Sequence, residues 1–389
     1  MAQFPSYDAA LLGALDAQAR AILGTFAAKS YARVEPPILQ PADVFLDRSG
    51  EEIRRRTFVL NDPSGRELCL RPDLTIPVCR MHLESGGKFP ARLSYHGAAF
   101  RVQINAPERP SQFLQTGVEC LGVTDRTAAD IEVLSLAVEG VRAAGLEEFS
   151  LQIGDVALFA GLLDTLDIPA QWRGRLKRHF WRPDYFRELL ARLSNGGSVP
   201  GERYLAHLGT ANEADARAAL SGLMDYLGGT PLGGRTREEI VDRLMEQAAE
   251  AAAVRLDKSA VQLIERVLQV AGPASKSIAA IRTLLKKNRI ALDAPLDLME
   301  ARIAALGRLG LSEKRVSFAA RFGRNMEYYT GFVFELWSRD SEGKVQIAGG
   351  GRYDTLLRTL GASSDIAAIG CAIRSERVLA ARARTTGAH

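Results

Sequence analysis

The sequence predicts an α+β fold in which helices flank an antiparallel sheet and a mostly helical insertion interrupts the chain. Short apolar alternations joined by hairpin-length loops fill the first part of the chain and are typical of half-buried strands. The middle part instead carries Ala, Leu, Glu and Arg in helical runs between Gly/Pro breaks, and strand-like alternation then returns. We therefore expect a core of residues 1–155 and 311–389 and a helical insertion of residues 156–310.

The first predicted element is a helix within residues 6–31. Apolar side chains recur there every three or four residues, the spacing of one helix face, and Ser6 or Asp8 can cap the first turn. The apolar face comprises Leu11, Leu12, Leu15, Ala19, Ile22, Leu23 and Phe26. Segment 31–40 follows and predicts a strand bent by its two adjacent prolines.

Alternating apolar residues predict further strands on both sides of the insertion. They lie within residues 56–60, 67–71, 92–102, 113–122, 149–153, 315–322, 331–338, 344–349 and 366–373. A helix before the strand at 149–153 carries Ile131, Leu134, Val138 and Val141 on one face. Segments 92–102 and 113–122 predict a hairpin, and we expect its Arg101, Gln115 and Glu119 to point into whatever the hairpin covers.

Composition narrows the class of protein. The chain has 389 residues, 47% of them apolar, and a formal net charge of +4, so it is long enough for two domains and has no tail typical of polyanion binding. The four cysteines form no CxxC pair, which predicts buried, reduced thiols without zinc or a disulfide framework. With no bilayer-spanning apolar run and no signal peptide, we expect a cytoplasmic protein without a membrane span.

Segment 68–77, LCLRPDLTIP, places Arg71, Asp73 and Thr75 at a strand-to-helix turn. Asp73 or Thr75 is suited to capping the helix by accepting free amide N–H groups. The alternative is functional, because a carboxylate and a hydroxyl also suit the ammonium group of a ligand. The residues by themselves leave both interpretations open.

Two later segments are equally ambiguous. Segment 321–335, RFGRNMEYYTGFVFE, has two adjacent tyrosines, which are more often half-buried sheet residues than ligand contacts. Segment 348–356, AGGGRYDTL, is a glycine-rich turn that lacks the GK[ST] of a phosphate loop, although its glycines permit close backbone approach.

Segment 172–193 of the insertion, WRGRLKRHFWRPDYFRELLARL, interleaves basic and aromatic residues. That composition suits a nucleic-acid-binding face or a surface for a protein partner. More often it belongs to a helix pair whose aliphatic stems cover a core.

In their order along the chain, these segments resemble the motifs of a class II aminoacyl-tRNA synthetase, and of histidyl-tRNA synthetase in particular. Segment 31–45 resembles motif 1, the dimer-forming segment, and segment 57–75 resembles the run that ends in R-P-E-G-T. The remaining matches are 100–122 to motif 2, 323–335 and 349–356 to the two histidine-specific signatures, and 369–377 to motif 3.

The resemblance implies a pocket for free histidine. Asp73, Thr75 and Gln115 would surround the amino group of the ligand, and Asp73 replaces a glutamate of the synthetase. Arg324 and Arg101 would face its carboxylate. A zwitterion requires such an anion and such a cation around it.

The imidazole end of the ligand is implied to face Glu119 and Tyr329. Tyr328 and Gly350 complete the implied regulatory histidine-binding set. The resemblance implies no catalytic residue, no metal ion and no cofactor.

The nucleotide half of the synthetase site does not match. The glutamate that follows the motif 2 arginine is Gln103 here, the loop 104–108 lacks the usual polar and basic residues, and a motif 3 glycine on the nucleotide floor is Arg374. Amino-acid activation needs a phosphate clamped by cations for in-line attack. Of the cations that the synthetase uses for this, the motif 3 arginine is kept as Arg377. We therefore expect that histidine is bound but not activated. Since the chain ends soon after Arg377, we expect no anticodon-binding domain and no tRNA partner.

These losses resemble the synthetase paralogues that act as regulatory subunits of ATP phosphoribosyltransferase, in the first step of histidine biosynthesis. That resemblance implies a self-dimer through the motif 1-like region, a hetero-octamer with a short-form catalytic subunit, and feedback inhibition by L-histidine. Two alternatives remain open: an active histidyl-tRNA synthetase-like enzyme, and another histidine-sensing protein with a different partner.

Overall fold

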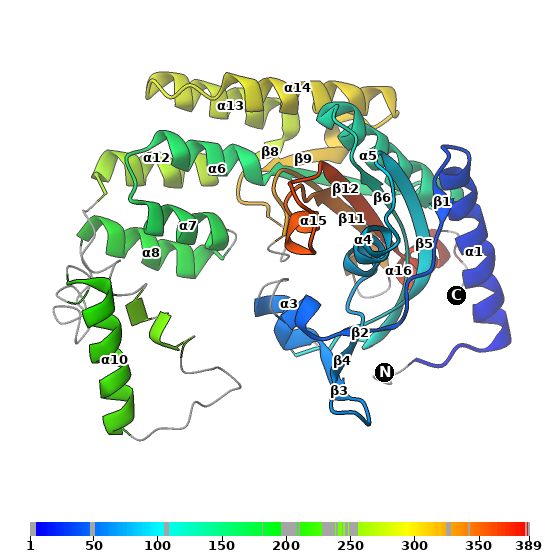
Figure 1. Cartoon of the computed structure of the whole chain (residues 1–389). Helices are drawn as coiled ribbons and strands as arrows, with labels where there is room; N and C mark the ends of the chain where they lie inside the picture. The colour runs from blue at the N-terminus through cyan, green and yellow to red at the C-terminus, as the bar shows by residue number, and fades with distance from the viewer. Residues whose placement is uncertain are drawn as a thin grey trace. The chain divides into compact units, whose positions relative to one another are not determined.

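The computed structural model describes residues 5–46, 51–104, 109–180, 182–195, 208, 211–227, 238, 240–242, 244–245, 248, 256–323, 328–340, 343–385 and 387. The chain forms two compact units. The first, which we call the sheet unit, comprises Met1–Leu158 and Gln269–His389, and the second, the helical unit, comprises Phe159–Leu268. Figure 1 shows the elements of both units, coloured along the chain.

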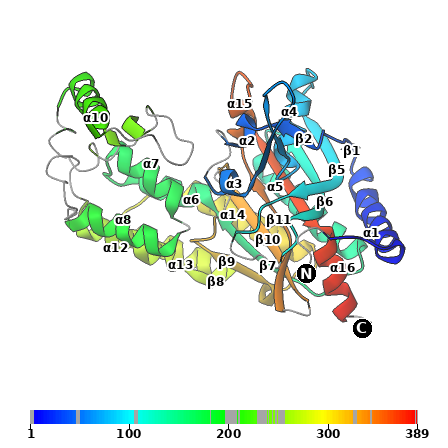
Figure 2. The ribbon, with the colours of Figure 1, turned by 90° about the horizontal axis from the view of Figure 1, so that it is seen from below.

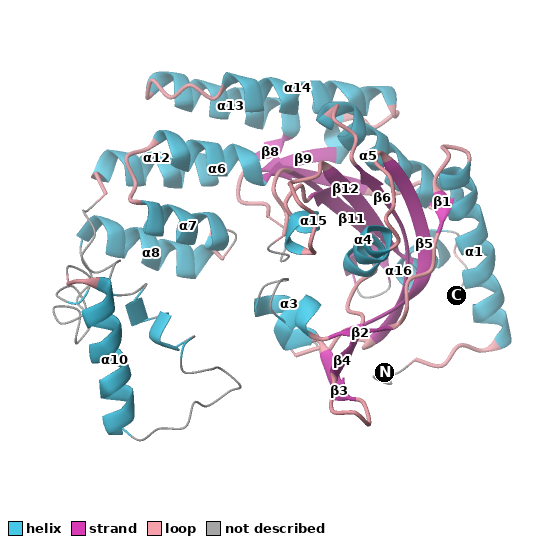
Figure 3. Ribbon diagram, viewed as in Figure 1, coloured by secondary structure: helices cyan, strands magenta, loops and turns pink. Residues whose placement is uncertain are grey.

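Nine strands of the described sheet unit form one sheet in the order β1-β5-β6-β12-β11-β10-β7-β9-β8, drawn in magenta in Figure 3. They are β1 Ala32–Arg33, β5 Ala91–Phe100, β6 Gln112–Leu121, β7 Ser150–Asp155, β8 Ala271–Pro273, β9 Val316–Ala319, β10 Phe332–Asp340, β11 Gly343–Arg352 and β12 Ala368–Arg374. The N-terminal strand β6 pairs with the C-terminal strand β12, so the expected sheet from distant segments is confirmed. Two pairings, β1 with β5 and β7 with β9, are parallel.

Three helices cover one face of this sheet: α1 (Ala9–Ala27), α5 (Arg126–Ala143) and α16 (Ser375–Thr385). Asp8 caps α1 by accepting a 2.8 Å hydrogen bond from the Leu11 amide, as the sequence predicted. Leu15, Ile22 and Phe26 of the predicted apolar face are buried. Leu11 and Leu12 are exposed instead, so the apolar face is narrower at its N-terminal end than predicted.

Two helices lie on the other face, α4 (Thr75–Glu84) and the short α15 (Leu356–Thr359), and they pack against each other. Figure 2 shows them on the opposite side of the sheet from α16. The core on this side is built around Leu74, Ile76, Tyr95 and Tyr353. The candidate site lies within this layer.

A second sheet has three antiparallel strands in the order β2-β4-β3. They are β2 Leu39–Pro41, β3 Phe58–Asn61 and β4 Glu67–Leu70, and α2 (Asp43–Leu46) and α3 (Glu51–Arg56) lie between β2 and β3 in the chain. Ile38, Leu39, Val59 and Leu60 are exposed on this small sheet and at its start. We call these four residues the apolar patch.

The helical hairpin of α13 (Ala274–Lys287) and α14 (Asp293–Arg308) belongs to the sheet unit, although the sequence placed it in the insertion. The unit boundary lies at Leu268 and Gln269, not near residue 310. The reason is packing: α13 contacts β8 and β9, and α14 contacts α5. A 3₁₀ turn, Glu313–Arg315, then leads into β9.

The helical unit contains α7 (Ala170–His179), α8 (Pro183–Asn195), α10 (Glu213–Leu227) and α12 (Lys258–Leu268), and α6 (Val156–Thr165) leads into it. In the basic and aromatic segment, Trp172, Phe180 and Phe186 are buried, and Phe180 stacks on Phe159 at 4.8 Å between ring centres. These three buried rings therefore build the core of this unit, as the core-covering interpretation predicted, and are not free to stack on bases.

Candidate functional site

The floor of the site comes from the pairing of β6 with β5 and β12. Because side chains alternate across a strand, Gln115, Gly117 and Glu119 share one face of β6, the face that carries α4 and Tyr95. Glu119 lies opposite Gly370 of β12. The predicted hairpin thus exists, and it turns Gln115 and Glu119 to the same side as expected.

The turn between β4 and α4 supplies one wall. Arg71 is almost fully buried and donates to the backbone oxygens of Ala98 and Pro36, at 2.7 and 2.5 Å, so its role is to hold two segments together. Asp73 accepts a 3.3 Å hydrogen bond from the Ile76 amide, as a cap would. Asp73 and Thr75 also line a cavity, so the two interpretations of this turn are compatible.

Glu119 is completely buried, and the Tyr353 hydroxyl donates a short hydrogen bond to it. Burial raises the pKa of Glu119 to about 8, against the lowering influence of the Tyr353 and Thr75 hydroxyls. The carboxyl is therefore largely protonated at neutral pH and can donate as well as accept hydrogen bonds.

Two glycines make room for these groups. A Cβ atom at Gly370 would overlap the carboxyl of Glu119, and one at Gly117 would lie 2.5 Å from the Tyr95 hydroxyl. Both positions therefore require glycine because a side chain approaches the strand closely.

The cavity above this floor has a volume of about 20 Å³, room for roughly one water molecule. Its lining comes from α4 and the turn before it, the end of the β5–β6 hairpin, β6, β11, β12 and the two signature segments. The lining residues are Asp73, Thr75, Arg101, Gln115, Tyr328, Tyr329, Gln346, Ala348, Gly349, Tyr353, Gly370, Cys371, Ala372 and Arg374. A ligand the size of an amino acid requires some of these side chains to move.

Six of the nine predicted histidine-binding residues line this cavity: Asp73, Thr75, Arg101, Gln115, Tyr328 and Tyr329. Glu119 lies beneath Tyr353 and not on the surface of the cavity. Gly350 packs away from it, because a Cβ there would meet the Phe334 ring and Cys371 of the neighbouring strands, whereas Gly349 faces the cavity. Arg324 lies outside the described residues.

Residues that the sequence did not single out complete the wall. Tyr353 lies between the cavity and Glu119, and its ring packs edge-on against Tyr328 with centres 5.8 Å apart. Gln346 donates a 2.8 Å hydrogen bond to Glu335. Tyr353 belongs to the second signature segment and directly follows β11. Strand periodicity gives no indication that a residue just after a strand reaches the carboxyl of Glu119.

Polar atoms at this site remain unsatisfied. Gln115 Oε1 and Glu119 Oε1 are buried and have no hydrogen-bond donor. Buried polar groups are almost always paired, so Gln115 Oε1 favours a ligand that brings an N–H group, and the largely protonated Glu119 favours a ligand that can also accept a hydrogen bond.

Arginine side chains occupy the side of the site that the synthetase resemblance assigns to a nucleotide. The Arg374 guanidinium lies over the Phe113 ring, 3.9 Å from its centre, and Arg101 lies 5.6 Å from the same centre. Arg101 also donates to the Pro72 carbonyl at 2.7 Å. Burial and the nearby Arg109 and Arg101 lower the pKa of Arg377, which shows that the arginines gather here.

A buried charge network lies behind the tyrosine segment. Asp130 of α5 pairs with Arg302 of α14 at 2.6 Å and with Arg352 of β11 at 2.5 Å. Arg352 also pairs with Asp354, whose amide donates to the Thr330 hydroxyl. The network therefore connects α14 to the residue that follows Tyr329.

Other site chemistries lack a basis in the described residues. No three His, Cys, Asp or Glu side chains there are grouped to hold a metal ion, and all four cysteines are buried without a disulfide. None of the described helices is long and apolar enough to cross a membrane.

The family described as histidyl-tRNA synthetase matches residues 12–221 and 219–378. An ATP phosphoribosyltransferase regulatory subunit of Brucella anthropi is 37% identical over 89% of this chain and 92% of its own length. One from Allorhizobium ampelinum is 38% identical over 94% and 98%. The solved structure of an ATP phosphoribosyltransferase regulatory subunit/histidyl-tRNA synthetase from Bacillus halodurans has a TM-score of 0.67 at 23% identity, over 98% of this chain and 83% of its own.

Proposed function

This chain belongs to the family of ATP phosphoribosyltransferase regulatory subunits, and on that premise we propose that it binds free L-histidine and transmits its presence to a separate catalytic subunit. A regulatory subunit acts on a catalytic partner. We further propose that the ligand is free L-histidine, that this chain catalyses no reaction itself, and that it assembles with short-form catalytic subunits.

The unpaired buried oxygens of Gln115 and Glu119 are the observation that supports histidine as the ligand. Gln115 Oε1 lies in the cavity wall with Asp73, where an ammonium group would donate to both. Arg101 lines the same cavity and suits a carboxylate. Glu119, with its raised pKa, can exchange hydrogen bonds with an imidazole in either direction.

Binding must open the site, since the cavity of about 20 Å³ is far smaller than an amino acid. Tyr328 and Tyr329 line the cavity from the segment that directly precedes β10. We infer that histidine displaces the tyrosine wall and separates Tyr353 from Glu119. A ligand that changes the packing of a wall gives the protein two states to report.

The filled nucleotide side supports the absence of aminoacyl activation. Arg374 lies on the face of Phe113, where the synthetase resemblance puts the nucleotide. An occupied floor cannot hold a triphosphate in line with a histidine carboxylate. The chain thus regulates and does not itself catalyse.

The apolar patch supports self-association. Ile38 and Leu39 belong to the motif 1-like segment, and the strand register puts Leu39 and Leu60 on one face of the small sheet and Val59 on the other. Exposed apolar clusters of this kind mark protein interfaces. The inferred self-dimer then joins short-form catalytic subunits in a hetero-octamer, where histidine shifts the equilibrium between two assembly states by about 1–3 kcal/mol.

A reconstitution tests the proposal. The purified chain is mixed with a short-form catalytic subunit, and phosphoribosyl-ATP formation is measured with and without L-histidine. We expect stimulation by the chain and inhibition by histidine. The variant Gln115→Leu should stimulate equally but respond less to histidine. If the mixture showed no complex and no stimulation, the regulatory role would be ruled out. Stimulation without any response to histidine would remove only the assignment of the ligand.

A further inference from the structure

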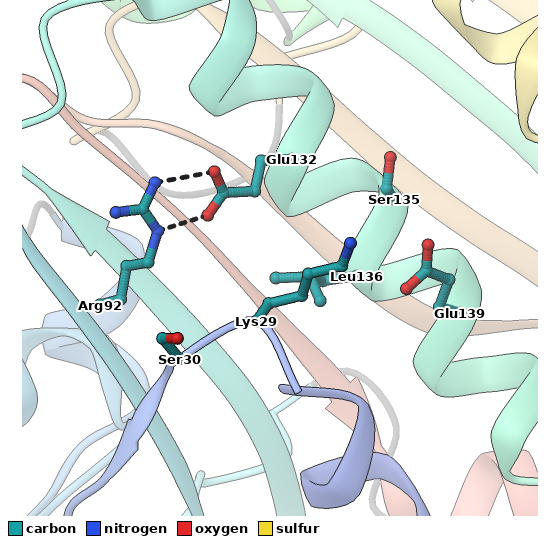
Figure 4. A pocket seen from close by; sticks show the side chains of 7 residues that line it. All are labelled: Lys29, Ser30, Arg92, Glu132, Ser135, Leu136 and Glu139. Carbon is teal, nitrogen blue, oxygen red and sulfur yellow. Dashed lines mark hydrogen bonds and ion pairs between the residues drawn. The ribbon is translucent and has the colours of Figure 1, made fainter. Parts of the chain in front are cut away.

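A second cavity lies on the other face of the sheet. It has a volume of about 420 Å³, within the range of small-molecule sites. Its wall comprises Lys29, Ser30, Arg92, Glu132, Ser135, Leu136 and Glu139, and Figure 4 shows these side chains. None of them lines the candidate histidine cavity. Arg92 pairs with Cys120 across β5 and β6, so it points away from the face that carries Glu119.

One wall of this cavity is fixed. Glu132 accepts hydrogen bonds of 2.7 and 2.9 Å from Arg92 and one of 2.8 Å from the Tyr31 hydroxyl. The hydrogen bonds from Arg92 lower the pKa of Glu132, so the carboxylate stays charged at neutral pH. The bidentate pair of Arg92 and Glu132 neutralises both charges and makes this wall of the cavity rigid.

The opposite rim is a tight turn at the end of α1. Ser30 has a φ of 62°, in the left-handed region that residues other than glycine rarely adopt. The Ser30 and Tyr31 amides close the turn by donating to Ala27 and Phe26, at 2.9 and 3.1 Å. The turn places Lys29 and Ser30 at the mouth of the cavity.

Two charges in the cavity have no such pairing. Neither Lys29 nor Glu139 forms an ion pair or hydrogen bond with its side chain in the part of the chain that the structure describes, although the exposed Lys29 lies near enough to Glu132 for its charge to help lower the pKa of that carboxyl. Lys29 extends from the α1 end toward the α5 face that carries Ser135, Leu136 and Glu139 (Figure 4). Glu139 is half-buried, and the buried Leu136 forms an apolar floor beside them.

We propose that this cavity is a second small-molecule site, which takes a zwitterion with a carboxylate for Lys29 and an ammonium group for Glu139. Both groups lie on rigid elements with an apolar floor for the carbon chain between them. A monovalent ligand would leave one of the two charges unmatched, so both ends are needed. The site is open on one side, and solvent screening makes its affinity modest.

Methyl NMR tests the site directly, because Leu136 reports from its floor. Glycine, β-alanine and γ-aminobutyrate are titrated while the shifts of the Leu136 methyl groups are followed, without L-histidine, because histidine is itself a zwitterion and Leu136 lines only this cavity. Acetate and methylammonium serve as probes with one charge. We expect saturable shifts for at least one amino acid of the series, with binding at least about tenfold weaker for either single-charge probe.

Matched variants assign the charges. Lys29→Met and Glu139→Gln should each weaken the zwitterion at least about tenfold. Lys276→Met removes the same charge from an exposed, remote position on α13 and should leave the affinity unchanged. No Leu136 shift with any zwitterion, equal affinity for acetate, or wild-type affinity in both Lys29→Met and Glu139→Gln would overturn the proposal. Because the two cavities share no residue, a failure of histidine to bind elsewhere leaves this result unaffected.

Discussion

Arg374 and Phe113 form a stacked pair across the end of the large sheet, with the guanidinium 3.9 Å from the ring centre. The two residues come from neighbouring strands, β12 and β6, which are paired directly. Cation–π stacking of this kind is worth about 0.5–2 kcal/mol, depending on solvent exposure. It also covers an aromatic face that would otherwise be open to a planar ligand. The pair therefore stabilises the end of the sheet and occupies the side of the site that the synthetase resemblance assigns to a nucleotide.

Replacing Arg374 tests whether it excludes a nucleotide. Arg374→Gly should expose the Phe113 ring and allow weak ATP binding, detectable by isothermal titration, while the wild-type chain gives no ATP heat. Phe113→Leu in the same variant should abolish the gained binding, because the stacking surface is lost. Equally tight ATP binding by wild type and Arg374→Gly would show that the arginine excludes nothing.

Gln115 should matter for histidine and little for stability. Its buried Oε1 has no donor, so an apolar replacement removes an unsatisfied group. We expect Gln115→Leu to raise the histidine Kd about 10- to 100-fold, the equivalent of a buried hydrogen bond to a charged group. Calorimetry measures this directly.

The matched control for that variant is Gln18→Leu. Gln18 is also buried with an unpaired Oε1, but it lies on α1, on the opposite face of the sheet. Its replacement should leave the histidine Kd at the wild-type value. Equal weakening by both variants would mean that the loss comes from general destabilisation.

Glu119 makes stability depend on pH in a defined direction. Its pKa is about 8 in the folded chain, against 4.5 for an ordinary, solvated glutamate, so the folded state keeps a proton that the unfolded chain releases. The free energy of unfolding should therefore fall as the pH rises from 4.5 to 8, by up to about 5 kcal/mol from this group. Urea denaturation across that range measures it.

The variant Glu119→Gln isolates this effect. It keeps the shape of the neutral carboxyl and cannot ionise. The contribution of residue 119 to the change in the free energy of unfolding between pH 4.5 and 8 should therefore disappear. Glu119→Gln should then be more stable than wild type at pH 8. An unchanged pH profile in the variant would place the titrating group elsewhere.

The buried charge network predicts a large effect at Arg302. Its side chain is only 5% exposed and pairs with Asp130 and Asp155. Arg302→Met leaves two carboxylates buried without this partner, and the expected loss is about 3–5 kcal/mol in the free energy of unfolding. Urea denaturation of the full chain checks the value.

Arg282 provides the comparison on the same helical hairpin. It has three acidic partners, Asp293, Asp297 and Glu300, against two for Arg302, but these three are exposed to solvent. Arg282→Met should shift the urea midpoint far less than Arg302→Met, because water solvates the remaining carboxylates. Similar losses at the two positions would contradict the role of burial.

The apolar patch predicts a change of oligomeric state. Leu39→Glu places a charge on the face of the small sheet that Leu39 shares with Leu60, so the self-dimer should dissociate at concentrations where wild type remains dimeric. Sedimentation equilibrium measures the two species. Leu298→Glu, at a similarly exposed leucine of α14, should keep the wild-type mass. A dimer that survives Leu39→Glu intact would move the interface elsewhere.

Local pattern was sufficient for much of the fold. The alternation in segments 92–102 and 113–122 predicted β5 and β6, and Asp8 caps the first helix as its position indicated. These features depend on neighbours along the chain, because periodicity and capping are set by the local backbone. The same pattern placed Gln115 and Glu119 on one face.

Tertiary packing decided the rest. Only the folded chain shows that Tyr353 stands between Glu119 and the cavity, that Gly350 faces a neighbouring strand, and that Arg374 covers Phe113. Strand periodicity fixes the side of a residue but not its rotamer or its partner from a distant segment.

The second boundary of the insertion shows the same division. Helical periodicity identified the segments of α13 and α14 as helices, but it carries no information about which unit they pack on. Arg302 decides that question, because its buried pairs with Asp130 and Asp155 hold α14 to the sheet unit. The sequence by itself determined the elements and one face of each, and the long-range burial of charge and apolar surface determined where they pack.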